Sequence, residues 1–156
     1  MANTDKRIVY QGENGRAVVV IPAPNYSGTM DDLLEKRVPE NCRDSANVVE
    51  VDTVPSDRTF RNSWVTKSGE SVSVDLDKAK DIAKDKVRQA RTPKFQELDI
   101  LYQRAIEENN SDKQAQIIAQ KKTARDATAD SKITSADSVA NLKTGMEAVI
   151  KTVGDL

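Results

Sequence analysis

The sequence predicts an α+β protein: a small N-terminal antiparallel β module over residues 1–75, followed by an elongated C-terminal helical region over residues 76–156. Two observations predict this class. Short β-branched runs separated by Gly, Asn and Pro fill the first half, and apolar residues recur at helical spacing in the second. Hydrophobic residues make up 37% of the chain but aromatic residues only 4%, so a wide layered core is not expected.

The first element expected is a β-hairpin. Residues 7–11 and 17–21 are β-branched runs on either side of Asn14 and Gly15, two residue types that tolerate the positive φ angles of tight turns. Pro22 ends the second run, because proline cannot donate a hydrogen bond to a sheet.

The rest of the N-terminal module is predicted to add one short helix and more strands. Thr29 can cap a helix over residues 29–36, with Asp32 placed for a capping box. Residues 47–51 read as a third strand. A second hairpin is expected from runs at 61–65 and 71–74 that flank 67–70, with Trp64 as its main anchor.

A long helix is predicted over residues 76–109, because its apolar or small positions recur about every 3.6 residues. Pro93 leaves two alternatives open. It either kinks one continuous helix at a cost of about 3 kcal/mol, or starts a second helix capped by Thr92. The positions of the stripe are Ala79, Ala83, Val87, Ala90, Lys94, Leu98, Leu101 and Ala105, widened on its flank by Ile82, Phe95, Tyr102 and Ile106.

A second helix is predicted over residues 111–126, beginning with a Ser-Asp-Lys-Gln capping box. The connection to the long helix is so short that the two helices must run antiparallel as a hairpin. This arrangement is expected to place Ala115 opposite Ala105, and Ile118 near Tyr102.

A last amphipathic helix is predicted over residues 135–153, after a cap pattern formed by Thr134 and Asp137. It is expected to continue in the direction of the preceding helix and to cover the first half of the long helix. Packing against a second copy is the alternative, and the sequence leaves it open. Its apolar positions step by three and four residues, at Val139, Leu142, Met146, Val149 and Val153.

The residue inventory disfavours catalysis, and we predict neither an enzyme nor catalytic, cofactor or metal residues. The chain has no His and a single cysteine, Cys42, so the commonest general base and metal ligand is missing. The net charge of −1 and the mixed charge signs give no footprint for nucleic acid. No signal-peptide core or membrane-spanning stretch is expected, so we predict a soluble protein with no membrane partner.

Residues spread over most of the chain carry a family resemblance. From Arg7 to about Ile133, the pattern resembles a group of small tailed-bacteriophage proteins that are mostly uncharacterised and tend to be encoded among tail and tail-fibre genes. The resemblance is carried by Phe60-Arg61-Asn62-Ser63-Trp64, Val74 to Ala79, Asp85 to Arg88 with Arg91, Leu98-Asp99 with Tyr102 and Ala105, and Gln120 to Lys122 with Arg125-Asp126.

The resemblance implies a bacteriophage virion-associated structural protein of the tail, collar or capsid, made in the host cytoplasm and located in the virion. Its expected partners are other phage structural proteins and further copies of the chain. The alternatives are a tail-fibre assembly chaperone that is absent from the mature virion, a host-protein-binding adaptor, and a phage accessory enzyme. The candidate protein-contact residues, chosen because a slender bundle cannot easily bury them all, are Val87, Phe95, Leu142, Met146 and Ile150.

Overall fold

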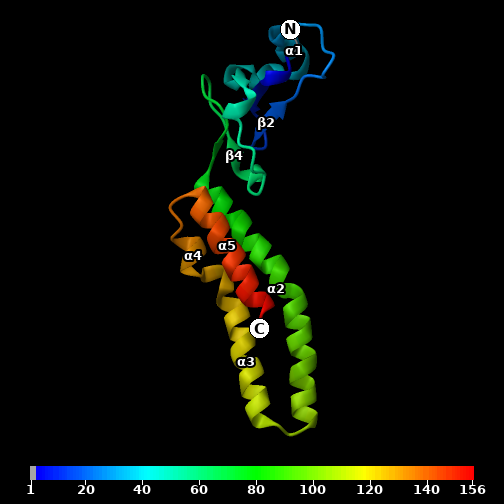
Figure 1. Ribbon diagram of the computed structural model, residues 1–156, viewed down its shortest axis with the longest axis vertical. Helices are drawn as coiled ribbons and strands as arrows, with labels where there is room; N and C mark the ends of the chain where they lie inside the picture. Colours follow the sequence, from blue (N-terminus) through cyan, green and yellow to red (C-terminus); the bar gives the residue numbers. More distant parts are fainter. Residues whose placement is uncertain (1–2) are drawn as a thin grey trace. The chain divides into compact units, whose positions relative to one another are not determined.

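A computed structural model describes residues 3–156 and confirms the α+β class (Figure 1). The chain divides into two compact units, Met1–Asp75 and Leu76–Leu156. This is the boundary that the sequence predicts, although residues 1 and 2 of the predicted β module lie outside the described part.

The N-terminal unit is built on a three-stranded antiparallel sheet in the order β2-β1-β3. In its register, Ile8 of β1 lies opposite Val20 of β2 and Val48 of β3. Gly15 adopts the positive φ of 73° that the predicted Asn-Gly turn requires. The strands are β1 (Lys6–Gln11), β2 (Ala17–Val20) and β3 (Asn47–Glu50).

Alternate residues of the sheet pack on different partners, because successive side chains of a strand point to opposite faces. One face carries Ile8 and packs against α1 (Met30–Arg37) and the 3-10 helix η2 (Glu40–Ser45). The opposite face carries Val9, which packs with Trp64 and Val72. The small unit therefore has apolar clusters on both sides of its sheet.

The predicted capping box of α1 is present. The Thr29 hydroxyl accepts a hydrogen bond from the Asp32 backbone N–H at 3.0 Å, and the Asp32 carboxylate accepts one from the Thr29 N–H at 3.1 Å. Hydrogen bonds from the side chain and the backbone N–H of Thr29 to the Asp32 carboxyl lower its pKa below the usual value. The sequence signal for this helix start is therefore confirmed at the level of individual atoms.

The second hairpin is shorter than predicted. Its strands are β4 (Trp64–Val65) and β5 (Ser73–Val74), which pair antiparallel with Trp64 opposite Val74. The prediction that its first strand begins at residue 61 is wrong, because Arg61–Ser63 form the 3-10 helix η4. The Ser63 hydroxyl donates to the Phe60 carbonyl at 2.6 Å and closes that turn. The remaining short helices of this unit are η1 (Asn3–Asp5) and η3 (Val51–Thr53).

The long helix α2 is continuous over Leu76–Glu107 and contains Pro93. Of the two alternatives for Pro93, the structure therefore has the unbroken helix. Proline cannot donate to the carbonyl four residues earlier. The neighbouring Thr92 hydroxyl donates to the Arg88 carbonyl at 3.0 Å. This side-chain bond lies next to the backbone bond that Pro93 cannot make to the Gln89 carbonyl.

The hairpin turn is a Schellman motif centred on Asn109. This residue has a φ of 51°, a left-handed conformation that asparagine tolerates better than most residues. The Asn110 N–H donates to the Ala105 carbonyl and the Asn109 N–H to the Ile106 carbonyl, both at 2.9 Å. Helix α2 consequently ends at Glu107, two residues before the predicted end.

Helix α3 occupies Ser111–Asp126, the bounds that the sequence predicts, but it is capped and oriented differently. The side chain of Asn110, and not that of Ser111, caps it by accepting from the Lys113 N–H at 3.0 Å. The buried residues are Ile117 and Ala124, whereas Ala115 and Ile118 are exposed. The predicted placement of Ala115 opposite Ala105 and of Ile118 in the interhelical contact is therefore wrong.

The last helix, α5, begins at Val139 and ends at Gly154, so the predicted start at residue 135 is wrong. The short elements η5 (Ala127–Ala129) and α4 (Ser131–Thr134) intervene. Ser138 caps α5 by accepting from the Asn141 N–H at 3.2 Å. Thr134 instead ends α4, so the predicted cap pattern does not start the last helix.

The chain also reverses direction before α5. The Thr134 carbonyl accepts from Lys80 Nζ at 3.1 Å, near the start of α2, while the Leu156 carbonyl accepts from Gln120 Nε2 at 2.7 Å. Helix α5 therefore runs parallel to α2 and antiparallel to α3, as Figure 1 shows. The expectation that it continues in the direction of α3 is therefore wrong.

Pro93 divides the helical unit into two halves that differ in packing. We call residues 76–92 of α2 together with α4 and α5 the base half, and residues 94–107 of α2 together with α3 the distal half (Figure 1). The packing of α5 on the long helix occurs within the chain. The buried apolar residues of the base half include Ala79, Ala83, Val87, Ile133, Leu142, Met146, Val149 and Val153, and those of the distal half are Leu98, Ala105 and Ile117.

Candidate functional site

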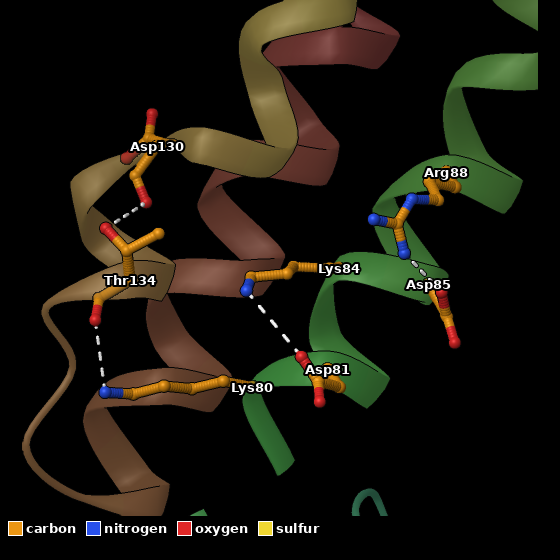
Figure 2. A network of polar contacts seen from close by, with 7 residues as sticks. All are labelled: Lys80, Asp81, Lys84, Asp85, Arg88, Asp130 and Thr134. Atoms are coloured by element: carbon orange, nitrogen blue, oxygen red, sulfur yellow. Dashed lines mark hydrogen bonds and ion pairs between the residues drawn. The ribbon is translucent and has the colours of Figure 1, made fainter. Parts of the chain in front are cut away.

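Cationic side chains of α2 hold the ends of the neighbouring helices. Lys80 reaches from α2 to the last carbonyl of α4, that of Thr134, at 3.1 Å, as Figure 2 shows. Arg91 Nη1 donates to the carbonyls of Ala124 and Arg125, near the end of α3, at 3.3 and 2.9 Å. The last carbonyls of a helix lack intrahelical partners and carry partial negative charge. These cations therefore fix α3 and α4 against α2.

Other charges on the same helix pair with each other. Arg88 pairs with Asp85, and Lys84 Nζ lies 3.7 Å from Asp81 Oδ1 (Figure 2). Both pairs join residues three positions apart on one helix, a spacing at which ion pairs contribute little to stability. The alternating charges of α2 thus have two roles: Lys80 and Arg91 position the other helices, and these pairs join neighbouring turns of α2 itself.

Three of the predicted protein-contact residues lie inside the chain. Val87 and Leu142 are 0% exposed and Met146 is 4% exposed. The expectation that a slender bundle cannot bury them is wrong, because α4 and α5 add a further layer over the base half. These side chains form the core between α2 and α5 and present no surface to a partner.

Phe95 and Ile150, the other two predicted contact residues, are only half-buried. The Arg91 guanidinium lies over the Phe95 ring, 5.7 Å from its centroid. Since Arg91 also bonds the end of α3, it places Phe95 beside the interface of α2 and α3. Ile150 lies at the edge of the α5 core, directly after the buried Val149.

The distal half exposes large apolar side chains that the base half does not. Ile100 is 56%, Ile106 is 43% and Ile118 is 50% exposed. Each helix of a pair can bury only one stripe of its surface against the other. Here the buried stripes consist of Leu98, Ala105 and Ile117. The isoleucines beside the stripe remain in water.

Two of these isoleucines share one side of the hairpin. Ile106 follows the buried Ala105, and Ile118 follows the buried Ile117. One residue further along a helix is a rotation of about 100°, and in two antiparallel helices that face each other this rotation leads to the same side. Ile100, two residues after the buried Leu98, points away from α3.

Phe95 and Tyr102 extend that side along α2, because they precede Ile106 by eleven and four residues, which are helical repeats. We call this set the flank surface: Phe95, Tyr102, Ile106 and Ile118. The periodicity of the sequence places its three α2 members on the flank of the apolar stripe. It gives no signal that Ile118 is exposed, because the polar and alanine-rich α3 does not define one apolar face.

A charged side chain holds the middle of the flank surface. Lys121 Nζ lies 2.6 Å from Asp99 Oδ1 and 4.8 Å from the centroid of the Tyr102 ring, and its side chain is only 18% exposed. The cation thus joins α3 to α2 through an ion pair and a cation–π contact. The Tyr102 ring is held in place by this contact and is only half-buried.

Within residues 3–156, no group of three or more His, Cys, Asp or Glu side chains is arranged to hold a metal ion. No helix in that range is long and apolar enough to cross a membrane. The single thiol, Cys42, is buried in the cluster of Ile8 and Tyr10. Burial and the neighbouring Cys42 raise the pKa of Tyr10 above its ordinary value. The clearest candidate site is therefore the flank surface.

Comparisons with known proteins found no protein family, curated protein or solved structure that matches the chain.

Proposed function

We propose that the protein is a structural component of a bacteriophage virion, in the tail, collar or capsid, and acts by protein–protein assembly. Two features support the proposal. The scattered residues between Arg7 and Ile133 resemble those of small tailed-bacteriophage proteins, and the flank surface leaves Ile106 and Ile118 exposed side by side on the distal hairpin. The exposed flank surface is the observation that carries the assembly role.

The partner we propose for the flank surface is a second copy of the chain. Two hairpins that pack through this surface would form a four-helix bundle, in which every apolar stripe of the distal half faces another helix. Such a contact is self-complementary, as a two-fold symmetric interface requires. The ion pair of Lys121 and Asp99 lies in the middle of this surface and would be enclosed by the contact.

The expected strength of this contact is modest. Full burial of an isoleucine contributes about 1.5–3 kcal/mol, so covering a half-exposed one contributes about 1 kcal/mol. The two half-exposed isoleucines of each copy therefore contribute about 4 kcal/mol in total, which only matches the lower end of the association cost of about 4–15 kcal/mol. The isolated protein is therefore expected to dimerise reversibly, and the high local concentration in a particle would make the contact permanent.

Quantitative mass spectrometry of purified virions tests the virion role. A structural component is expected in a fixed number of copies per particle. If particles that assemble normally contain no copies, the structural role is wrong. If the chain is also required for tail-fibre attachment, the assembly chaperone takes its place.

A matched pair of variants tests the surface. Ile118→Glu places a charge within the proposed contact and is expected to reduce incorporation into particles. Ile100→Glu changes an equally exposed isoleucine on the opposite side of α2 and is expected to leave incorporation unchanged. Equal incorporation of both variants would contradict the role of the flank surface.

A further inference from the structure

The N-terminal unit contains a small pocket at one end of its sheet, on the face that packs against Trp64. Its volume is about 200 Å³. Ligand sites for drug-sized molecules occupy about 300–1,000 Å³, so only a small chemical group fits this pocket. Its walls are formed by Val19, Ile21, Val51, Val54, Pro55 and Ser56, together with Arg7, Arg58 and Trp64.

The charge of this pocket has one sign. Among the described residues, its lining contains two arginines and no acidic side chain. Three carboxylates are neighbours of lining residues in the sequence, and none lines the pocket. Asp57 Oδ1 accepts from the Thr59 N–H at 2.9 Å and from the Thr59 hydroxyl at 2.6 Å. Glu50 pairs with Lys6, and the third carboxylate is Asp52. The pocket therefore favours an anion.

Arg7 is held in position with donors to spare. Its Nη1 donates to the carbonyls of Thr4 and Lys6, at 2.7 and 2.8 Å. A guanidinium carries five N–H groups, so those on Nε and Nη2 are not used by these bonds. Arg58 is exposed and forms no ion pair within residues 3–156. A planar carboxylate matches the fork of N–H donors that an arginine presents.

Trp64 supplies a second, independent indication of a hydrogen-bond acceptor. The residue is 1% exposed and lines the pocket, yet its indole nitrogen is buried with no partner among residues 3–156. Buried polar groups in proteins are nearly always hydrogen-bonded, and an exception requires an explanation. An acceptor bound in the pocket, directly or through a water molecule, explains this one.

The apolar walls of the pocket indicate which chemical group carries the negative charge of the ligand. Ile21 is 57% and Val51 is 40% exposed, and both line the pocket with four further apolar residues. A branched aliphatic group would cover this apolar surface, whereas a bare inorganic anion would not. We propose that the pocket binds a carboxylate carried on a small branched aliphatic group, either as a free acid or as the C-terminal residue of a polypeptide.

A larger pocket in the same unit does not show this complementarity. It measures about 700 Å³ and is lined by both Lys6 and Asp31, whose charges oppose each other. Its position at the start of α1 is already used, because Thr29 is engaged in the capping box. The hydroxyl of Tyr26, which lines that pocket, is also buried without a partner among residues 3–156. The opposing charges of the lining nevertheless select no class of ligand.

Nuclear magnetic resonance of the full chain tests the proposal, because Trp64 is the only tryptophan and gives a single indole N–H signal. Titration with 3-methylbutanoate is expected to shift this signal and to saturate in the millimolar range. The neutral amide of the same acid and acetate, which lacks the aliphatic group, are each expected to bind about tenfold more weakly or not at all. An unchanged indole signal, or equal binding of acid and amide, would overturn the proposal.

Matched variants locate the site. Arg58→Gln is expected to weaken binding of 3-methylbutanoate about tenfold, while Lys67→Gln, which removes an exposed cation away from the pocket, leaves it unchanged. An equal loss in both variants would contradict a site at Arg58. The rest of the spectrum shows whether each variant remains folded.

Peptides that end in valine separate the two sources of the carboxylate. Tighter binding of a peptide with a free C-terminus than of the free acid, with loss on amidation, assigns the pocket to polypeptide ends. Tighter binding of the free acid assigns it to small molecules. Binding of the amidated peptide as strong as that of the free one would overturn the proposal.

Discussion

The two halves of the helical unit share one continuous helix but differ in how completely they bury it. In the base half, α4 and α5 cover Ala79, Ala83 and Val87, all of which are 0% exposed. In the distal half, α3 alone leaves Ile100 and Ile106 about half in water. The difference shows that an apolar stripe becomes a core or a contact surface according to the number of helices that pack against it.

The base half also contains a closer contact between helices. Gly145 of α5 lies so close to α4 that an added Cβ would come 2.3 Å from the Lys132 carbonyl oxygen. Residues 94–126, which form the distal half, contain no glycine, and their core consists of Leu98, Ala105 and Ile117. The base half therefore has less tolerance for change than the distal half.

The largest expected effect is a loss of stability caused by a cavity in the base half. Leu142→Ala leaves a cavity at a fully buried position and is expected to lower the free energy of unfolding by about 2–5 kcal/mol. Ile118→Ala removes a half-exposed side chain of the distal half and should cost less than about 1 kcal/mol. Urea unfolding at low protein concentration measures both, and equal losses would show that the two halves are packed alike.

Two glycines of α5 sharpen the comparison. Gly145→Ala forces α4 and α5 apart and is expected to destabilise the unit by about 1–3 kcal/mol. At Gly154 an added Cβ meets nothing within 4 Å, so Gly154→Ala should stabilise the helix end by about 0.5–1 kcal/mol. Thermal unfolding followed by circular dichroism measures both changes in stability, the loss at Gly145 and the gain at Gly154. A neutral Gly145→Ala would mean that α4 does not pack tightly on the base half.

Pro93 separates the halves, and its replacement tests whether they are coupled. Pro93→Ala restores the hydrogen bond to the Gln89 carbonyl. An interior proline costs about 3 kcal/mol, partly offset because it also restricts the unfolded chain. We expect a net stabilisation of about 1–2 kcal/mol, with a single unfolding transition. A variant that unfolds in two transitions would show instead that the halves are independent.

The smallest expected effect is a pH dependence at the base. A hydrogen bond from Asn141, assisted by Lys80, lowers the pKa of Asp137 before α5. A carboxyl whose pKa is lower in the folded state contributes stability that is present above its unfolded value of about 3.9 and is lost as the pH falls through the folded value. Melting temperatures between pH 6 and 3 should therefore fall less steeply in Asp137→Asn than in the wild type. Identical slopes would contradict this role.

Local sequence signals account for much of the fold. The capping box of Thr29 and Asp32, and the bounds of α3, follow from residues within one helical turn of each boundary. Continuous periodicity identifies the stripe of α2, in which even Lys94 is largely covered, with 15% of its side chain exposed. Such features depend on neighbouring residues and can be predicted without the tertiary structure.

Features fixed by tertiary contacts are not predicted. The face of α3 is set by the left-handed Asn109, because a polar helix has no apolar stripe of its own to select one. The chain reversal before α5 depends on the four-residue helix α4, which is too short to give a periodic signal. The sequence also misassigns Val87, Leu142 and Met146, which are buried within the chain, to a contact surface.

The central claim is that the flank surface of the distal half contacts a second copy, whereas the base half serves as the internal core. Light scattering of the purified full chain over a range of concentrations tests it most directly. The account predicts a mass that rises from monomer to dimer with concentration in the wild type and in Ile100→Glu, and that stays monomeric in Ile118→Glu. A wild type that remains monomeric at every concentration, or a dimer that Ile118→Glu leaves intact, would contradict it.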